Sequence, residues 1–134
     1  MEFTGLQISL SRPEGNNCPM PKKRIPDDEG QKFLADLPLS TAMAVRYLLQ
    51  LLEEREPGGT IELRVPPFGA VQLIGGLSHR RGTPPNVVEL DPENFLELAL
   101  GRSTWDALTL EGRLLVSGSR AEELRKLFPI SEVR

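Results

Sequence analysis

The stretch RVPPFGAVQLIGGLSHRRGTPPNVVEL, residues 64–90, decides the fold because turn residues divide it into short apolar segments. Pro66-Pro67 ends one segment, since neither ring nitrogen can donate a hydrogen bond to a neighbouring strand. Gly75-Gly76 has the composition of a two-residue hairpin turn. With the alternating residues that precede it, the stretch predicts four successive strands: Thr60–Val65, Ala70–Ile74, Leu77–Arg81 and Asn86–Leu90.

The glycine pair fixes a testable register for the second and third predicted strands. If Gly75-Gly76 is the whole turn, Gln72 opposes His79 and Val71 opposes Arg80, and opposed residues share a face of the sheet. We therefore expect His79 and Arg80 to point to opposite sides.

Helical periodicity appears on both sides of these strands. Ser40 is a candidate N-cap, with Leu39 as a staple to Ala44, and Asp91-Pro92 opens a second helix. Further segments follow as a helix from Ser103 to Leu110, a fifth strand at Arg113–Ser117, and a last helix with a Ser119/Glu122 capping box. The order predicts an α+β domain with a mainly antiparallel five-stranded sheet covered on one side by helices.

The N-terminal part has a different composition. Residues 1–38 are rich in proline and carry no sustained apolar period, so we expect a largely disordered extension before a domain at residues 39–130. Met20 is an alternative start, because the residues before it are foreign in composition to those after it.

Composition excludes several classes of function. The net charge is −3, which argues against a nucleic-acid partner. One cysteine and one histidine predict no disulfide and no metal site. No segment has the apolar length of a membrane span or the form of a signal peptide, so we expect no stable membrane insertion and a cytoplasmic location.

Enzyme signatures are absent from the sequence, and we predict no catalytic residue and no cofactor. His79 stands beside two arginines, and their positive charge makes an imidazole a poorer base. An alternative use of this region is an accessory or interaction module that recognises a protein partner or an anionic metabolite. Its candidate residues are Arg64, His79, Arg80, Arg81 and Thr83.

Several motifs together resemble a known family. They are RVPPFGAVQ at residues 64–72, RGTPPNVVE at 81–89, DPxxFLxLAxGR at 91–102, STW at 103–105 and GRLLVSG at 112–118. This combination, over Leu39–Phe128, resembles the bacterial, actinobacterial-type branch of the sterol carrier protein family. The resemblance implies a five-stranded sheet covered by helices around an apolar cavity that takes fatty acyl lipids or sterol-like compounds. No catalytic or metal-binding residue carries over from it.

The leading hypothesis is therefore a small, non-catalytic protein that binds a hydrophobic molecule between its sheet and its helices. Phe68 follows the Pro-Pro break, where its side chain can project over the sheet, and Trp105 is the only tryptophan. The candidate cavity lining is Phe68, Val71, Leu73, Leu96, Leu100, Trp105 and Leu108.

Overall fold

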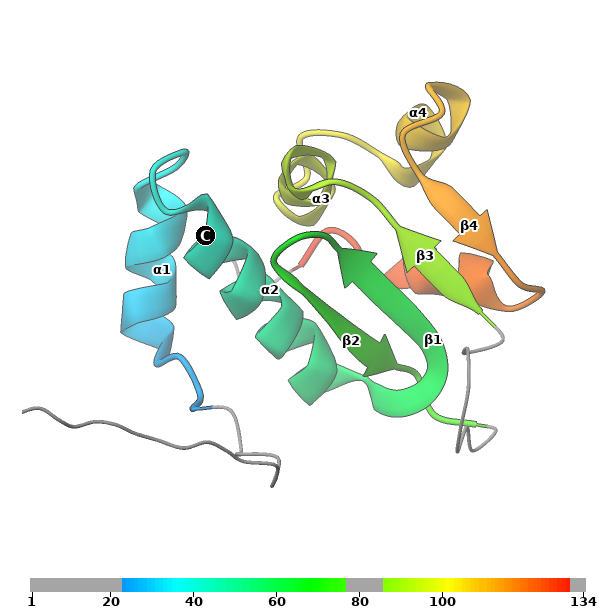
Figure 1. The fold of residues 1–134 in the computed structure, drawn as a ribbon, viewed down its shortest axis with the longest axis horizontal. Helices are drawn as coiled ribbons and strands as arrows, with labels where there is room; N and C mark the ends of the chain where they lie inside the picture. Colours follow the sequence, from blue (N-terminus) through cyan, green and yellow to red (C-terminus); the bar gives the residue numbers. More distant parts are fainter. Residues whose placement is uncertain (1–22, 77–85, 131–134) are drawn as a thin grey trace, which may run out of the picture.

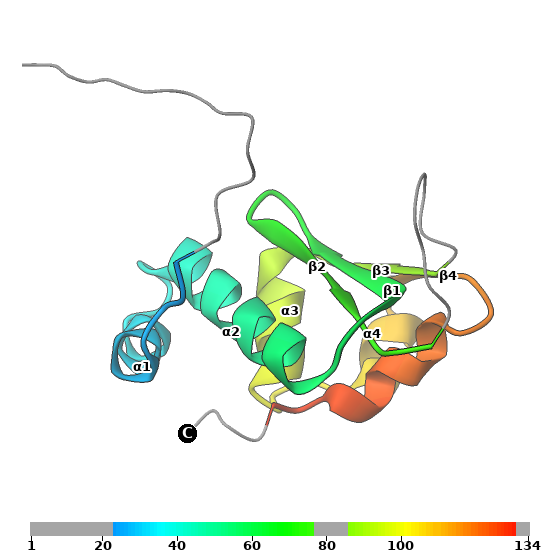
Figure 2. The same ribbon diagram turned by 90° about the horizontal axis from the view of Figure 1, so that it is seen from below.

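The computed structural model of the protein describes residues 23–76 and 86–130. These residues form a mixed sheet with helices packed on one of its faces (Figures 1 and 2). The elements in chain order are α1 (Asp27–Ala35), α2 (Thr41–Arg55), β1 (Pro57–Val65), β2 (Gly69–Leu73), β3 (Val87–Glu89), α3 (Pro92–Ala99), α4 (Trp105–Leu110), β4 (Leu115–Ser117) and the 3-10 helix η2 (Ala121–Leu127).

The sheet corrects the predicted topology. Its described strands number four, in the order β2-β1-β3-β4, and the β1–β3 pair is parallel while the other two pairs are antiparallel. The expected strand Leu77–Arg81, with its pairings to Gln72 and Val71, lies outside the described residues. β2 returns to the end of β1 at which β3 begins, as the partners of Ile61 and Glu62 show. Because β3 starts there on the other side of β1, it must run in the same direction.

The alternation predicted for β1 is confirmed. Ile61, Leu63 and Val65 are fully buried, and Leu63 pairs with Val71 on one side and Val88 on the other. These side chains face the helices, while Glu62 and Arg64 point to the opposite face. The apolar interior therefore lies on the side of the sheet that the helices cover, and Figure 2 shows the helices on that side.

Some helix ends follow the sequence and others do not. The Asp91 carboxylate accepts a hydrogen bond from the Asn94 amide at 2.8 Å, as predicted for the start of α3. Ser40 does not cap α2 in this way, because its hydroxyl donates to Asp36 instead, and Leu39 is 86% exposed rather than packed as a staple. The predicted capping box of the last helix is also not formed, since Arg120 occupies the cap position of η2.

Helix α1 lies within the segment for which the sequence predicts a largely disordered extension. It packs beside α2 (Figure 1), and Gly30 allows this contact because a side chain there would overlap the ring of Tyr47. For residues 23–38 the structure therefore shows a packed helix and its flanking turns, whereas residues 1–22 are outside the described part.

Candidate ligand groove

A groove of about 610 Å³ lies where α2 passes β2, the terminal strand of the described sheet. Its third wall is the segment Lys23–Pro26 that precedes α1, which we call the strap. The residues that line the groove are Lys23, Arg24, Ile25, Met43, Arg46, Leu49, Gln50, Glu53, Glu54, Phe68, Gly69, Ala70 and Val71. Its size falls in the range of small-molecule sites in proteins.

The groove combines an apolar floor with charged and amide side chains. Leu49 and Val71 are almost completely buried, and Ile25, Met43 and Phe68 are half-buried around them. Half-buried apolar side chains can lose further contact with water when a hydrophobic molecule covers them. The groove can therefore hold an apolar ligand without any change in the core below it.

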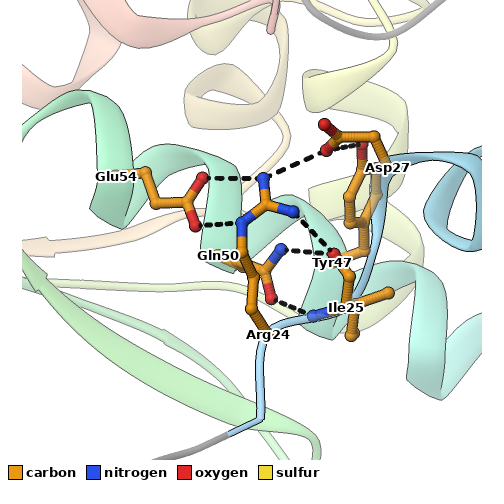
Figure 3. A network of polar contacts seen from close by, with 6 residues as sticks. All are labelled: Arg24, Ile25, Asp27, Tyr47, Gln50 and Glu54. Carbon is orange, nitrogen blue, oxygen red and sulfur yellow. Dashed lines mark hydrogen bonds and ion pairs between the residues drawn. The ribbon is translucent and has the colours of Figure 1, made fainter.

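Gln50 of α2 fixes the strap by binding both backbone groups of one residue (Figure 3). Its side-chain oxygen accepts a hydrogen bond from the Ile25 amide at 2.8 Å, and its side-chain nitrogen donates to the Ile25 carbonyl at 2.9 Å. The paired bonds reproduce those of a backbone partner in a sheet, so they set both the position and the orientation of Ile25. The Ile25 side chain is thereby kept at the groove wall.

Arg24 joins the strap to α2 and α1 through charged contacts (Figure 3). Its guanidinium donates to both carboxylate oxygens of Glu54, at 2.7 and 3.0 Å, and to Asp27 at 3.1 Å. Tyr47 also donates its hydroxyl proton to Asp27, at 3.0 Å. A forked guanidinium suits such a two-oxygen contact, although these side chains are exposed and their ion pairs are screened by water.

The same contacts shift the acidity of the groups involved. The hydrogen bond from Arg24, and then the one from Tyr47, hold the pKa of the Asp27 carboxyl below its ordinary value. Burial of the Tyr47 phenol, and then its bond to the ionised Asp27, raise the pKa of Tyr47. Both shifts favour an ionised Asp27 and a protonated Tyr47 near neutral pH. The network therefore joins the strap to α1 and α2.

The structure does not bring the seven predicted lining residues into one cavity. Phe68 and Val71 line the groove, whereas Leu96 and Leu108 line a second, more polar groove of about 700 Å³ beside α3. Leu73 is fully buried in the core and Leu100 is half-buried at the end of α3. Neither of these two lines either groove.

Trp105 belongs to the packed interior. Its ring centroid lies 6.4 Å from that of Phe128, and its indole nitrogen donates to a Glu122 carboxylate oxygen at 3.0 Å. Phe128 also meets Phe95 edge to face, with the ring centroids 6.2 Å apart. We call Phe95, Trp105 and Phe128 the aromatic cluster. Trp105 is 5% exposed, so its apolar surface is already covered by protein.

The sequence did not point to the α2 wall of the groove. Met43, Arg46, Gln50 and Glu53 recur at intervals of three and four residues, which places them on one face of the helix. That face combines an apolar, a basic, an amide and an acidic side chain, and it resembles an ordinary solvated face. The periodicity was available as a signal, but it becomes informative only once β2 and the strap are seen opposite it.

The alternative anion site is largely outside the described residues, because His79, Arg80, Arg81 and Thr83 all fall between residues 77 and 85. The remaining member, Arg64, lies on the open face of β1. Its guanidinium is 2.9 Å from a Glu62 carboxylate oxygen and 4.0 Å from one of Glu89. Arg64 therefore already has two acidic neighbours that an incoming anion would have to displace.

Residues 39–130 match the family model described as bacterial SCP ortholog. The chain belongs to this family. The match confirms the resemblance to bacterial sterol carrier proteins and covers every element from α2 to η2. A search of curated proteins found no match to the chain. The strap and α1 precede the part that matches the bacterial SCP model, so one wall of the groove comes from residues outside it.

No helix in the described ranges 23–76 and 86–130 is long and apolar enough to cross a membrane.

Proposed function

We propose that the protein is a small, non-catalytic carrier or binder that takes a hydrophobic ligand in the groove between α2, β2 and the strap, and that it acts in the cytoplasm. The observation that carries this proposal is the apolar lining of the groove by Ile25, Met43, Leu49, Phe68 and Val71. Membership of the bacterial SCP family supports the same class of ligand.

The energetics of such binding are adequate. Each methylene removed from water contributes about 0.8 kcal/mol, so an alkyl chain of roughly ten carbons contributes at most about 8 kcal/mol. Association and ordering remove several kcal/mol of this, and an open groove leaves part of the chain in water. We therefore expect affinities for simple alkyl ligands in the micromolar range or weaker.

The proposal is tested by titrating the delipidated full chain with a fluorescent fatty-acyl probe and displacing that probe with the uncharged alcohol decanol. The Phe68→Asp variant places a carboxylate in the groove lining, where an apolar ligand would strip it of water. We expect it to weaken decanol binding by at least about tenfold. The matched control is Leu110→Asp, at a position that is 89% exposed and does not line the groove, and it should bind like the unmodified chain.

Native mass spectrometry of the gently purified chain, followed by solvent extraction, provides an independent measurement. A co-purified lipid that is absent from the Phe68→Asp variant would support the proposal. Absence of any probe or lipid binding to the unmodified chain would overturn it, and so would equal binding to Phe68→Asp. The alternative role of Arg64 and the residues near His79 stays a prediction, and no contact among the described residues favours it.

A further inference from the structure

Arg46 lines the groove and has no charged partner among the residues that the structure describes. Its Nε lies 3.4 Å from the Phe68 carbonyl oxygen and its Nη1 lies 3.6 Å from the Met43 sulfur, so both contacts are long and go to uncharged atoms. No carboxylate of residues 23–76 or 86–130 forms an ion pair with it. By contrast, the following arginines each have a carboxylate oxygen within 3.2 Å: Arg24, Arg64, Arg113, Arg120 and Arg125.

Charges are distributed unevenly along the groove. Glu53 lies seven residues after Arg46 on α2, which separates the two by about 10 Å along the helix axis. The neighbouring Glu54 already forms an ion pair with Arg24, and Lys23 lies on the strap. A separation of about 10 Å equals the Debye length at roughly 0.1 M salt, so Glu53 opposes an anion near Arg46 only weakly. An anionic group is therefore favoured at the Arg46 end.

We propose that the groove selects hydrophobic ligands that end in a carboxylate, and that Arg46 binds this carboxylate at the groove end formed by Met43 and Phe68. This rests on the proposed function. The planar guanidinium presents paired N–H donors that match the two oxygens of a carboxylate, and its present contacts are weak enough to be exchanged. The alkyl chain then runs along Leu49 and Val71 toward the strap.

The experiment compares two ligands of equal chain length, decanoate and decanol, by displacement of a neutral fluorescent probe from the full chain. It is carried out at about pH 8, where the decanoate carboxyl is ionised. We expect the unmodified chain to bind decanoate about tenfold more tightly than decanol, as a charge-assisted hydrogen bond would give. Arg46→Gln should lose that preference and bind decanoate and decanol equally. Arg46→Lys should keep part of it, since the charge remains but the fork is lost.

Two matched variants test whether the preference for decanoate over decanol depends on Arg46 alone. Lys23→Gln removes the other groove cation that has no described partner, and Arg102→Gln removes an arginine of the second groove, so both should keep the tenfold preference. Equal binding of decanoate and decanol to the unmodified chain would overturn the inference and leave the proposed function standing. A preference that survives in Arg46→Gln, or disappears in Lys23→Gln, would also overturn it. Failure of both ligands to bind would instead overturn the proposed function itself.

Discussion

The aromatic cluster and the groove both contain apolar side chains, yet only the aromatic cluster is closed. Phe95 is completely buried, and edge-to-face and tilted ring contacts fill the space between it, Phe128 and Trp105. The groove is lined by apolar side chains together with charged and amide ones, and a volume of about 610 Å³ stays open beside Phe68 and Val71. Rings from three separate segments fill the aromatic cluster. The groove has the strap as one of its walls and stays open.

Because of this difference, we expect the aromatic cluster to contribute mainly to folding stability and the groove mainly to ligand binding. Residues of the aromatic cluster have exchanged water for protein contacts during folding, so they have little more to gain from a ligand. Half-buried residues of the groove keep some contact with water and can lose it on binding. The two regions should therefore respond differently to the loss of one aromatic ring.

The largest expected effect comes from Phe95→Ala. Removing a fully buried ring that packs edge to face on Phe128 should lower the free energy of unfolding by about 3–5 kcal/mol. Phe68→Ala should lower it by only about 1 kcal/mol, because that side chain is half-buried. Urea unfolding followed by circular dichroism measures both values. Equal losses for the two variants would show that the groove is part of the closed core.

Those parts of the fold that depend on neighbouring residues were predictable from the sequence. The Asp91 cap, the end of β1 before Pro66, and the alternation of Ile61, Leu63 and Val65 each follow from local chemistry. The parallel pairing of β1 with β3 was not predictable in this way, because it depends on which side of β1 the chain takes after β2. Strand segments can be predicted from the two-residue alternation of apolar and polar side chains. Their order in the sheet depends on contacts between distant parts of the chain.

The candidate site was predicted only in part, for a related reason. Periodicity identifies which faces are apolar, yet it contains no information on where packing is incomplete. Of the expected lining residues, Phe68 and Val71 line the groove. Trp105 was expected to line a cavity, but Phe128 and Glu122 already cover and bind it. The strap was missed because Ile25 lies in a proline-rich segment and its hydrogen bonds go to Gln50 of α2, 25 residues away in the sequence.

Gly30→Ala should have the second largest effect. It tests whether the packing of α1 on α2 supports the strap, which is one wall of the groove. The added methyl group favours a helix by about 0.5–1 kcal/mol, but it overlaps the ring of Tyr47, which is 1% exposed and cannot move aside. Overpacking of this kind costs about 1–3 kcal/mol, so we expect a net loss of about 1–2 kcal/mol in the free energy of unfolding.

The control for this variant is Gly75→Ala, where the added methyl group meets nothing within 4 Å. Its unfolding free energy should change by less than about 0.5 kcal/mol. Amide hydrogen exchange at Ile25 should also be faster in Gly30→Ala and unchanged in Gly75→Ala. The reason is that α1 contains both Gly30 and Asp27, and Asp27 binds Arg24 of the strap. Unchanged stability of Gly30→Ala would mean that α1 does not pack on α2 as described.

Gln50→Ala should have a smaller effect, confined to the strap. It removes both side-chain hydrogen bonds to Ile25, at a cost of about 1–2 kcal/mol that solvent access to the exposed strap reduces to roughly 1 kcal/mol. We expect weaker displacement-probe binding together with faster amide exchange at Ile25. The control Glu53→Ala changes a neighbouring groove residue and leaves both Gln50 hydrogen bonds to Ile25 in place, so exchange at Ile25 should stay unchanged. If Gln50→Ala left that exchange rate unaltered, the strap would be held by other contacts.

The smallest effect concerns the charges that hold the strap. Because Arg24 and Tyr47 lower the pKa of Asp27, the ionised carboxylate stabilises the folded chain at pH values above the ordinary aspartate pKa of about 3.9. That contribution is lost as the pH falls through the lower pKa of the folded state. Asp27→Asn removes it, so the difference in urea midpoint between the unmodified chain and this variant should shrink as the pH is lowered from about 5 to about 2.

Glu123→Gln is the matched comparison on the other side of the molecule, since Arg120 lowers the pKa of Glu123 in the same direction. Both carboxylates are exposed, so salt should reduce both contributions. Amide exchange at Ile25 distinguishes them, because only Asp27 belongs to the strap network. A pH-dependent change at Ile25 in Asp27→Asn but not in Glu123→Gln would show that charge, in addition to the Gln50 bonds, keeps the groove wall in place. Identical exchange profiles in the two variants would leave the Gln50 bonds as the fastening of that wall.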